Sequence, residues 1–449
     1  MNEFCSHVQL EVVTSKHIHE QNHLLPGTLI FLGTSERNID TLVFCLNDGQ
    51  CCQISPQNEN THLNICHLTD LDFSQFPYQA IYRAFDADLS DSDIDLQDRS
   101  CDDNLIFRAE CPSFINEGFD GYYINQESLP FVLSPKDNAI TLANFKSWAE
   151  AHHNELRLLM DSQGAILLRG FPITNAEDFA TTVKAVIGRE LIDYKGEGSR
   201  KRIVQGVYTS TEAPPKFKIP LHNELTCTIN PVDYICFYCD IAPKPGTGQT
   251  LLARTQEVTI EMMKRPHIWN LFDGKILKYI SRHPSEGNYF TYVNPTHKTW
   301  QEAFETADRN EVEKICEQKG YDFKWMDDWI EVTRHVPAIR GPDQYFDHPY
   351  WFNQAHLYHA NPRLYGGWLN YLLAKLLYIA PSTRPYDIAF DDGSKIARKT
   401  IYEIYDILDE KTIKFNWEKG DVLLLDNHQT LHGKAPSVGQ RRILAAMVQ

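Results

Sequence analysis

The stretch Asp421-Val-Leu-Leu-Leu-Asp-Asn-His-Gln-Thr-Leu-His432 predicts strands and tight turns near the end of the chain. Lys419-Gly420 before it is a turn signal, Val422–Leu425 reads as a buried strand, and Asp426-Asn427 reads as a second turn. A final apolar strand is expected over residues 441–448. We therefore expect a β-sheet domain in which His432 lies just beyond a strand and faces the mouth of the fold.

A second stretch, Leu221-His222-Asn223-Glu224, places a histidine and a carboxylate two residues apart. With 18 histidines and 60 acidic residues in 449 positions, about two such triplets arise by chance, so the triplet alone decides nothing. Its context carries more weight, because residues 218–221 and 234–239 both read as strands. Alternate residues of a strand point to one face, so His222 and Glu224 are expected side by side inside a barrel.

Two histidines and one carboxylate are the ligand set of non-haem Fe(II) oxygenases, since they leave the opposite side of the metal open. Arg441 and Arg442 follow His432 by nine and ten residues. A guanidinium group matches a carboxylate in two parallel hydrogen bonds, so an inward arginine here suggests a dicarboxylate co-substrate such as 2-oxoglutarate. Strand register decides which of the two arginines faces inward, and both stay candidates on the residues alone.

Composition excludes several classes of protein. The formal net charge of −17 argues against a general nucleic-acid binder, which needs a clustered positive face. No apolar run reaches the roughly 20 residues that span a membrane, and the first residues lack a secretory signal, so we expect a cytoplasmic protein. The 11 cysteines are an odd number without a small-scaffold spacing, and neither Cys51-Cys52 nor Cys236 with Cys239 has a matching pair for structural zinc.

Three parts of the chain are expected. Residues 1–84 read as a small β-rich N-terminal domain, with strands over Thr28–Leu32 and Thr41–Cys45. Residues 85–110 read as an acidic linker, because eight aspartates fall between positions 86 and 103. A calcium loop there lacks the glycine and the final acidic residue that it requires. Residues 111–449 form the predicted catalytic domain.

Helices are expected to flank the strands. One is predicted from Thr141 to Met160, and Asn175 caps the next, after a strand over residues 165–171. A helical insertion is predicted over about 296–345, because residues 299–319 and 325–332 both show a helical pattern. Residues 364–379 predict a further helix, whose apolar stripe core packing explains.

Taken together in order and spacing, several short motifs resemble one known group. They are Leu168-Arg-Gly-Phe171, Tyr208-Thr-Ser-Thr211, Leu221-His-Asn-Glu224, Gly246-Thr-Gly-Gln-Thr250, Trp351-Phe-Asn-Gln354 and Leu431-His432-Gly. Over roughly residues 115–449 the chain resembles the Fe(II)/2-oxoglutarate dioxygenases of the taurine dioxygenase superfamily, on its clavaminate-synthase-like side. Its pattern is nearest to the amino-acid hydroxylases of nonribosomal-peptide pathways. The resemblance implies a mainly β fold with α insertions, built on a jelly-roll (double-stranded β-helix, cupin-like) core.

The resemblance also implies roles for individual residues. Iron ligation falls on three of them: His222, Glu224 and His432. Thr250 would hydrogen-bond the co-substrate. Arg442 would bind its distal carboxylate, with Arg441 as the alternative; the family's spacing favours Arg442. Partners that orient the ligand imidazoles are expected near the site, with Asn427 or Tyr238 as candidates.

A second group of polar residues follows Trp351. Asn353 and Gln354 are candidates for contacting substrate, although the alternative, that they finish a strand and stabilise its turn, has equal weight. His356 and His359 are expected to be packing or surface residues, because the metal set is already complete.

The implied reaction consumes 2-oxoglutarate and O2, releases succinate and CO2, and hydroxylates an unactivated C–H bond. The expected substrate is an amino acid, either free or tethered to a carrier protein. Glu224 favours hydroxylation, because relatives that halogenate replace this ligand with a small residue. Desaturation or epoxidation at the same iron site is an alternative, as is a non-catalytic jelly-roll binding protein with a vestigial site. Oligomeric state is not predicted.

Overall fold

The computed structural model divides the chain into two compact units, residues 1–101 and 102–449. In the first unit, and at residues 106–108, it describes only the backbone of strands. In the second unit it also describes side chains, over these ranges: 115, 118–124, 129–137, 139–194, 200–210, 215–291, 294, 297–378 and 380–449. The predicted linker 85–110, apart from 106–108, lies outside the described residues, as do the Asp91–Asp95 segment and the side chains of Cys51 and Cys52.

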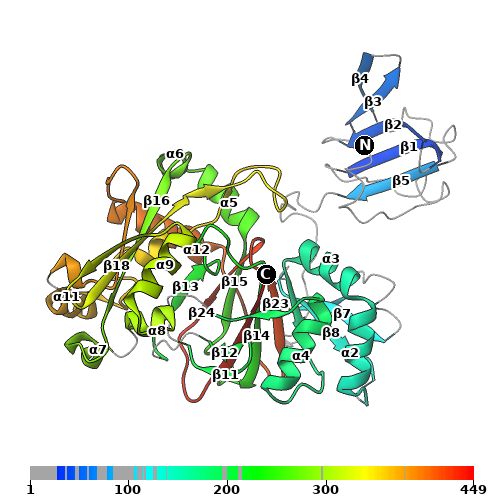
Figure 1. The fold of residues 1–449 in the computed structure, drawn as a ribbon. Helices are drawn as coiled ribbons and strands as arrows, with labels where there is room; N and C mark the ends of the chain where they lie inside the picture. The colour runs from blue at the N-terminus through cyan, green and yellow to red at the C-terminus, as the bar shows by residue number, and fades with distance from the viewer. Residues whose placement is uncertain are drawn as a thin grey trace. The chain divides into compact units, whose positions relative to one another are not determined.

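The first unit contains a five-stranded antiparallel sheet with the order β4-β3-β2-β1-β5 (Figure 1). Its strands are β1 (Thr28–Ser35), β2 (Asn38–Cys45), β3 (Gln50–Gln57), β4 (Asn60–His67) and β5 (Tyr78–Arg83). Both strands predicted in this part of the sequence are present: Thr28–Leu32 is the first part of β1, and Thr41–Cys45 is the last part of β2.

The second unit is built on a ten-stranded sheet with the order β11-β12-β25-β14-β23-β9-β8-β7-β6, in which β10 also pairs with β25. Its strands are β6 (Ile106–Arg108), β7 (Phe119–Ile124), β8 (Phe131–Pro135), β9 (Ala165–Leu168), β10 (Leu191–Ile192), β11 (Arg202–Val204), β12 (Val207–Thr209), β14 (Tyr234–Ile241), β23 (Val422–Asp426) and β25 (Arg442–Val448). Strand β6 lies within the predicted linker 85–110 and pairs with β7. The apolar runs predicted as β9, β14, β23 and β25 are strands.

A four-stranded sheet with the order β13-β24-β15-β22 packs against the large sheet. Its strands are β13 (Ile219–His222), β15 (Thr250–Arg254), β22 (Ile413–Phe415) and β24 (Thr430–Lys434). One buried cluster joins the two sheets, with Phe237, Leu423 and Ile443 from the large sheet and Leu252 and Phe415 from the small one. Two sheets packed over one core, with antiparallel pairing except between β8 and β9, are consistent with the predicted jelly roll.

Three helices cover the outer face of the large sheet (Figure 1): α2 (Leu142–Ala151), α3 (His153–Gln163) and α4 (Ala176–Ile187). The single helix predicted over 141–160 is wrong, because His152 leaves the helical conformation and separates α2 from α3. Its ring bonds the Trp148 carbonyl oxygen at 2.8 Å, in competition with the backbone ladder. Asn175 caps α4 as predicted, since its side chain accepts a hydrogen bond from the Asp178 amide.

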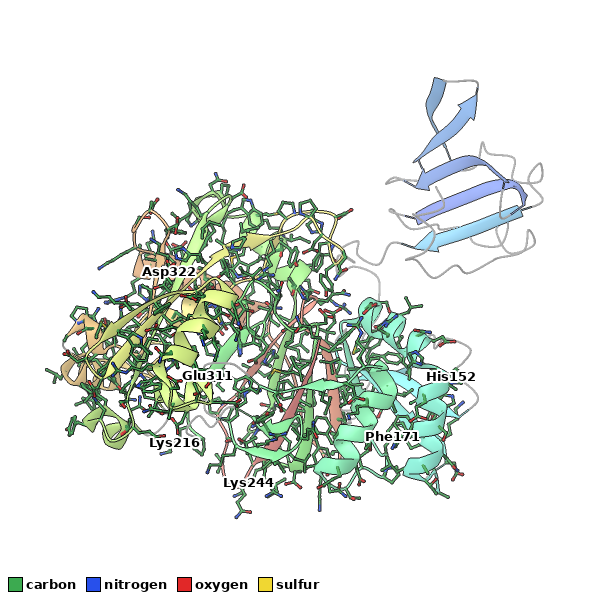
Figure 2. The ribbon with its side chains drawn as sticks, in the orientation of Figure 1. His152, Phe171, Lys216, Lys244, Glu311 and Asp322 are labelled. Carbon is green, nitrogen blue, oxygen red and sulfur yellow. The ribbon has the colours of Figure 1, made fainter. Side chains whose placement is uncertain are left out.

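The predicted helical insertion is only partly helical. Helices α8 (Trp300–Phe304) and α9 (Arg309–Lys319) are present, but residues 325–332 belong to a hairpin of β17 (Asp322–Met326) and β18 (Trp329–Pro337). Together with β16 (Ile276–Pro284) and β21 (Tyr386–Phe390), the hairpin forms a four-stranded sheet with the order β17-β18-β16-β21. Burial alternates along β18, as a half-buried strand requires. Figure 2 labels Glu311 of α9 and Asp322 of β17 in the insertion. His152 and Phe171 lie at the opposite end of the second unit, beside the helices that cover the large sheet (Figure 2).

Further helices pack on the outside of the small sheet: α5 (Thr255–Met263), α6 (Pro266–Phe272), α10 (Ala355–Tyr358) and α12 (Arg398–Glu410). Helix α11 (Trp368–Leu377) differs, because Tyr371 is its one buried residue, while Leu369 and Leu376 are 71 % and 67 % exposed. The prediction that core packing explains its apolar stripe is therefore wrong. Across the described part of the chain, no helix has the length and apolar character needed to cross a membrane.

Candidate metal centre

His222, Glu224 and His432 converge between the two sheets. His222 ends β13 and lies opposite His432 of β24 in the strand pairing, which puts their ring centroids 4.5 Å apart. Glu224 follows in the turn after β13. One ligand atom from each residue lies within 4.8 Å of the other two. The structure therefore brings the three predicted ligands together, although two local expectations are corrected: His432 lies on a strand rather than beyond one, and Glu224 lies beyond its strand rather than on it.

His222 is held as a neutral imidazole. Its Nδ1 lies 2.9 Å from the Pro220 carbonyl oxygen, an acceptor, so Nδ1 must carry the proton. The lone pair of Nε2 is then available to a metal ion. Burial, together with the nearby His432, lowers the pKa of His222 to about 3, which keeps the imidazole neutral at physiological pH.

Glu224 is held as a carboxylate. Burial by itself would raise the pKa of its carboxyl group, but Arg200 and His432 outweigh burial and keep this pKa below its ordinary value. Arg200 Nη2 donates to Glu224 Oε2 at 3.0 Å, and His432 Nε2 lies 3.6 Å from the same oxygen. The side chains of Arg200 and Glu224 are 3 % and 7 % exposed, so this ion pair is almost dry.

Asn427 fixes the backbone that carries Glu224. Its side-chain oxygen accepts a hydrogen bond from the Glu224 amide at 2.7 Å, and its amide nitrogen donates to the carbonyl oxygens of Glu224 and Val232 at 3.0 and 2.9 Å. Asn427 thus positions the carboxylate ligand rather than an imidazole. The other candidate, Tyr238, donates to the Ile173 carbonyl oxygen at 3.3 Å on the outer face of the large sheet, away from the site.

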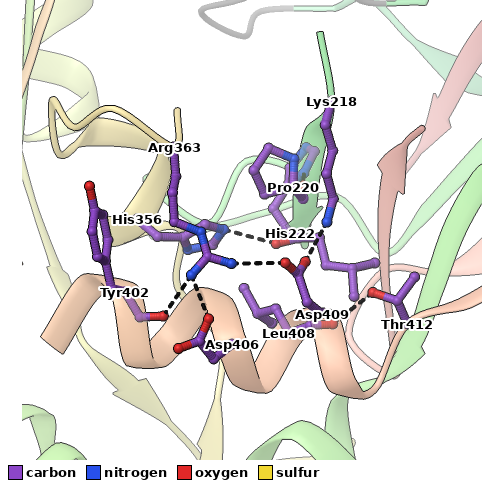
Figure 3. Close-up of polar contacts among 11 residues, drawn as sticks. Lys218, Pro220, His222, His356, Arg363, Tyr402, Asp406, Leu408, Asp409 and Thr412 are labelled. Atoms are coloured by element: carbon purple, nitrogen blue, oxygen red, sulfur yellow. Dashed lines mark hydrogen bonds and ion pairs between the residues drawn. The ribbon is translucent and has the colours of Figure 1, made fainter. Parts of the chain in front are cut away.

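The strand that carries His222 is braced from outside by α10 and α12. His356 Nε2 contacts the Leu221 carbonyl oxygen at 2.9 Å, and Lys218 forms an ion pair with Asp409 of α12. Arg363 binds the same aspartate at 2.9 Å and Asp406 at 2.5 Å (Figure 3). His356 is fully buried, and burial lowers its pKa to about 4, which fits the packing role expected for it.

A small cavity opens beside the two histidines. It is lined by Arg200, Ser210, Ile219, His222, Phe237, Thr250, His432, Gly433, Lys434, Arg441 and Ile443. Thr250 is buried and its hydroxyl accepts a hydrogen bond from Trp417 Nε1 at 3.0 Å, which leaves the hydroxyl proton for another acceptor. Lys434 lies opposite Thr250 in the strand pairing, and burial together with the charge of Arg441 lowers its pKa to about 8.

The two adjacent arginines face opposite ways. Arg441 lines the cavity, its Nε donates to the Gly248 carbonyl oxygen at 3.0 Å, and burial lowers its pKa to about 10. Arg442 forms an ion pair with Asp240, and its side chain is 57 % exposed. Arg441, and not Arg442, is therefore the arginine that lines the cavity, because one residue along a strand reverses the side-chain direction. The family's spacing favours Arg442, and which of the two binds the co-substrate stays a prediction.

Asn353 and Gln354 do not line this cavity. Asn353 is fully buried; its amide nitrogen donates to the Ala338 carbonyl oxygen at 2.8 Å, and its oxygen accepts from the Ala355 amide at 3.1 Å. These contacts agree with the alternative reading, in which the residue stabilises a turn. The backbone amide of Gln354 donates a hydrogen bond to the Tyr279 hydroxyl at 3.0 Å. His359 is also largely buried, and burial lowers its pKa.

A larger cavity of about 230 Å³ borders the turn that follows Glu224. Leu225 and Cys227 of that turn line it, and so does Tyr194, whose ring lies 4.2 Å from the Arg200 guanidinium. The remaining wall comes largely from the insertion and carries both signs of charge, with Lys298, Lys319, Arg334, Glu302 and Glu305. The metal centre therefore has a roomier cavity beside it.

Two residues at the site were missed from the sequence. Lys434 follows His432 by two positions on one strand, so alternation alone could have placed it on the same face. Arg200 lies in a polar segment without periodicity, and its approach to Glu224 depends on the tertiary fold.

The ligand set fits a divalent metal ion of the Fe(II) type. A neutral imidazole, a second buried imidazole and an ionised carboxylate offer nitrogen and oxygen donors from one side. The inward Arg441 next to them suits an anionic co-substrate. Fold and site together define a metal-dependent oxygenase on two packed β-sheets.

Comparison with protein families agrees with this class. The model of the "Taurine catabolism dioxygenase TauD, TfdA family" matches residues 127–447, and the chain belongs to this family. The resemblance noted in the sequence is thereby confirmed, and the chain is an enzyme of the class of oxygenases that use Fe(II), 2-oxoglutarate and O2.

Two curated relatives are similar over most of their length. A clavaminate synthase-like protein of Arabidopsis thaliana is 29 % identical over 338 residues, which cover 72 % of this chain and 94 % of that protein. The dapdiamide synthesis protein DdaC of Enterobacter agglomerans is 28 % identical over 296 residues, which cover 66 % and 85 %. Among solved structures, PvcB of Pseudomonas aeruginosa matches with a TM-score of 0.39 and 14 % identity, covering 73 % of this chain and 94 % of that one.

Proposed function

We propose that this protein is an Fe(II)- and 2-oxoglutarate-dependent hydroxylase of an amino acid or an amino-acid-derived molecule, either free or tethered to a carrier protein. His222, Glu224 and His432 hold the iron. Arg441 and Thr250 hold the distal carboxylate of 2-oxoglutarate. One observation carries the proposal. The three ligand atoms lie within 4.8 Å of one another, and the cavity beside them is lined by Arg441, which forms no ion pair with an acidic residue that the structure describes.

The roles of the protein residues follow from their contacts. Iron with 2-oxoglutarate and O2 supplies, when bound, the oxidising power to attack an unactivated C–H bond. His222 and His432 offer lone pairs, and Glu224 offers a negative charge that Arg200 partly balances. Arg441 contributes a positive charge in a partly buried place, where its attraction for a carboxylate is stronger than in water. The walls of Phe237 and Ile443 keep water away from the reacting atoms.

The amino-acid character of the substrate is supported by the larger cavity. Its wall contributes lysine, arginine and glutamate side chains together with the ring of Tyr194. Both signs of charge suit a zwitterion, whose ammonium and carboxylate groups each need a partner of opposite charge. DdaC, one of the similar proteins, is by its name a dapdiamide synthesis protein, which is in keeping with a role in specialised metabolism.

An anaerobic titration tests the cofactor chemistry. Fe(II) and 2-oxoglutarate are added to the apoprotein, and we expect a visible metal-to-ligand charge-transfer band that His432→Ala abolishes. A wild-type protein without such a band, measured beside a dioxygenase that develops one, would contradict the proposal and favour a binding protein with a vestigial site.

Product mass then separates the possible reactions. Succinate release identifies a substrate from a panel of amino acids and carrier-bound amino acids. A product heavier by one oxygen atom is expected, whereas loss of two hydrogen atoms would establish desaturation. Epoxidation also adds one oxygen atom but consumes a double bond, which NMR of the product detects.

Two expectations remain predictions: the division of the chain into residues 1–84, 85–110 and 111–449, and a cytoplasmic location.

A further inference from the structure

Arg200 has more hydrogen-bonding capacity than its surroundings use. Its side chain is 3 % exposed, and Nη2 donates to Glu224. Nε and Nη1 are both buried, and neither makes a hydrogen bond of good geometry with a residue that the structure describes; the Tyr194 side chain also contacts the guanidinium group. Buried guanidinium groups are normally satisfied, because each unpaired N–H forfeits the hydrogen bonds that water would have made. The free N–H groups of Arg200 therefore call for a ligand.

The charge of the side chains that line the small cavity indicates which kind of ligand would bind there. Arg200, Lys434 and Arg441 all line it, and none of the described lining residues is acidic. Glu224, which is not among the described lining residues, pairs with Arg200 through Nη2. In a chain of formal net charge −17, a pocket with three basic side chains is an unusual place, and it favours an anion.

These basic groups lie at two ends of the cavity. His432 and Lys434 are two residues apart on β24, which separates their positions along the strand by roughly 7 Å. In the strand pairing, His222 lies opposite His432 at the metal end, which is the first end, and Thr250 lies opposite Lys434 at the second end. Arg200 belongs to the first end through its bond to Glu224. Arg441 acts electrostatically on Lys434 and belongs to the second.

We propose that Arg200 binds a carboxylate at the metal end of the cavity, through an N–H group that Glu224 leaves unused. This inference rests on the proposed function. Two molecules could bring that carboxylate: 2-oxoglutarate, through its keto-acid end, or the substrate, through its own carboxylate, since the Tyr194 ring that contacts Arg200 also lines the larger cavity. In either case Arg200 links the ionised Glu224 to an anion beside the metal, and it makes a carboxylate a requirement for binding there.

The test uses the full chain loaded with Mn(II), which resists oxidation and replaces Fe(II) in binding measurements. Calorimetry gives the affinity for Mn(II), and then for 2-oxoglutarate, of the wild type, Arg200→Gln and Arg200→Lys. Arg442→Gln is the matched control, because it removes an ion-paired arginine that faces away from the cavity. A second arm titrates common amino acids and their α-amides into the 2-oxoglutarate complex of each protein.

We expect Arg200→Gln to weaken carboxylate binding at least about ten-fold, because a charge-assisted hydrogen bond in a buried site is lost. Arg200→Lys should recover part of the loss, and Arg442→Gln should stay within about two-fold of the wild type. Weaker 2-oxoglutarate binding identifies the keto acid as the source. Unchanged 2-oxoglutarate binding, with an amino acid that loses affinity while its amide does not, identifies the substrate.

Equal 2-oxoglutarate affinity in wild type and Arg200→Gln, with no amino acid that the wild type binds more tightly, would overturn this inference and leave the proposed function intact. A wild type that binds neither Mn(II) nor 2-oxoglutarate would overturn both. If Arg200→Gln no longer binds Mn(II), Arg200→Lys decides by the same criteria, because it keeps a positive charge beside Glu224 while changing the donor geometry.

Discussion

The two faces of the large sheet carry different chemistry on the same strands. Toward the small sheet, Phe237 and Ile443 line the cavity beside the metal ligands. Toward the helices, their neighbours Tyr238 and Leu444 belong to an apolar cluster under α2–α4. Both faces are buried, so burial does not distinguish them. The direction of each side chain does, and it reverses at every residue of a strand.

Arg441 and Arg442 show how much depends on that reversal. They are adjacent, chemically identical and close to the start of β25, yet one lines the cavity and the other pairs with Asp240 on the outer side. The desolvated Arg441 can hold an anion strongly, whereas the half-exposed Arg442 is screened by water. Matched substitutions on the inner and outer faces should therefore differ in their effects.

The largest difference between the faces should be in metal binding. Glu224→Ala removes an inner carboxylate that is a proposed ligand, and we expect the affinity for Mn(II) to fall at least about 100-fold. Asp240→Ala removes an outer-facing carboxylate on β14 and should change the affinity less than two-fold. Calorimetric titration of both variants measures the effect. Equal affinities would break the assignment of the ligand set.

The arginine pair should separate next. Arg441→Ala should raise the dissociation constant of 2-oxoglutarate roughly 30-fold, about 2 kcal/mol, because it deletes a charged hydrogen bond in a buried site. Arg442→Ala should leave the constant unchanged within about two-fold. Titration of 2-oxoglutarate into the Mn(II)-loaded variants is the measurement. The reverse order would restore Arg442 as the co-substrate residue.

Substitutions of Asn427 and Tyr238 compare how much one side chain on each face contributes to the free energy of unfolding. Asn427→Ala removes three buried hydrogen bonds around the Glu224 turn, and we expect the free energy of unfolding to fall by about 2 kcal/mol. Tyr238→Phe removes one long hydrogen bond on the outer face and should cost about 0.5 kcal/mol. Urea unfolding of both apoproteins decides. A larger cost for Tyr238→Phe would contradict the positioning role of Asn427.

The smallest expected effect concerns pH. Burial, opposed by the amides of Gln429 and His428, raises the pKa of Asp426 on the helix-covered side to about 7. A carboxyl group whose pKa is raised on folding favours the folded state most below the pKa of the unfolded chain, about 4, and this contribution is lost as the pH rises through about 7.

The wild type should therefore lose on the order of 1 kcal/mol more stability between pH 5 and pH 8 than Asp426→Asn, which keeps an oxygen acceptor but cannot ionise. Unfolding midpoints across this range provide the measurement. Parallel pH profiles for the two proteins would show that Asp426 is ionised in the fold at little cost.

Several elements followed from the sequence because their signals are local. The apolar runs that became β9, β14, β23 and β25 bury both of their faces, and a buried strand must be apolar throughout. The Asn175 cap needs only its own side chain and the amide of Asp178. Elsewhere local signals misled: at His152 a helix-like pattern runs through a break, and residues 325–332 alternate as a strand within a segment read as helical.

For the candidate site, the sequence determined which chemical groups are present: two histidines, one carboxylate and a pair of arginines at defined spacings. The tertiary structure decided which of them meet. Strand pairing placed His222 opposite His432, the turn after β13 turned Glu224 toward them, and the register of β25 selected Arg441 over Arg442. It also brought Arg200 to Glu224 from a segment without any pattern of its own. Residue type fixes charge and ligand chemistry, but distance and direction arise only when sheets pack, because a shift of one residue along a strand exchanges its inside for its outside.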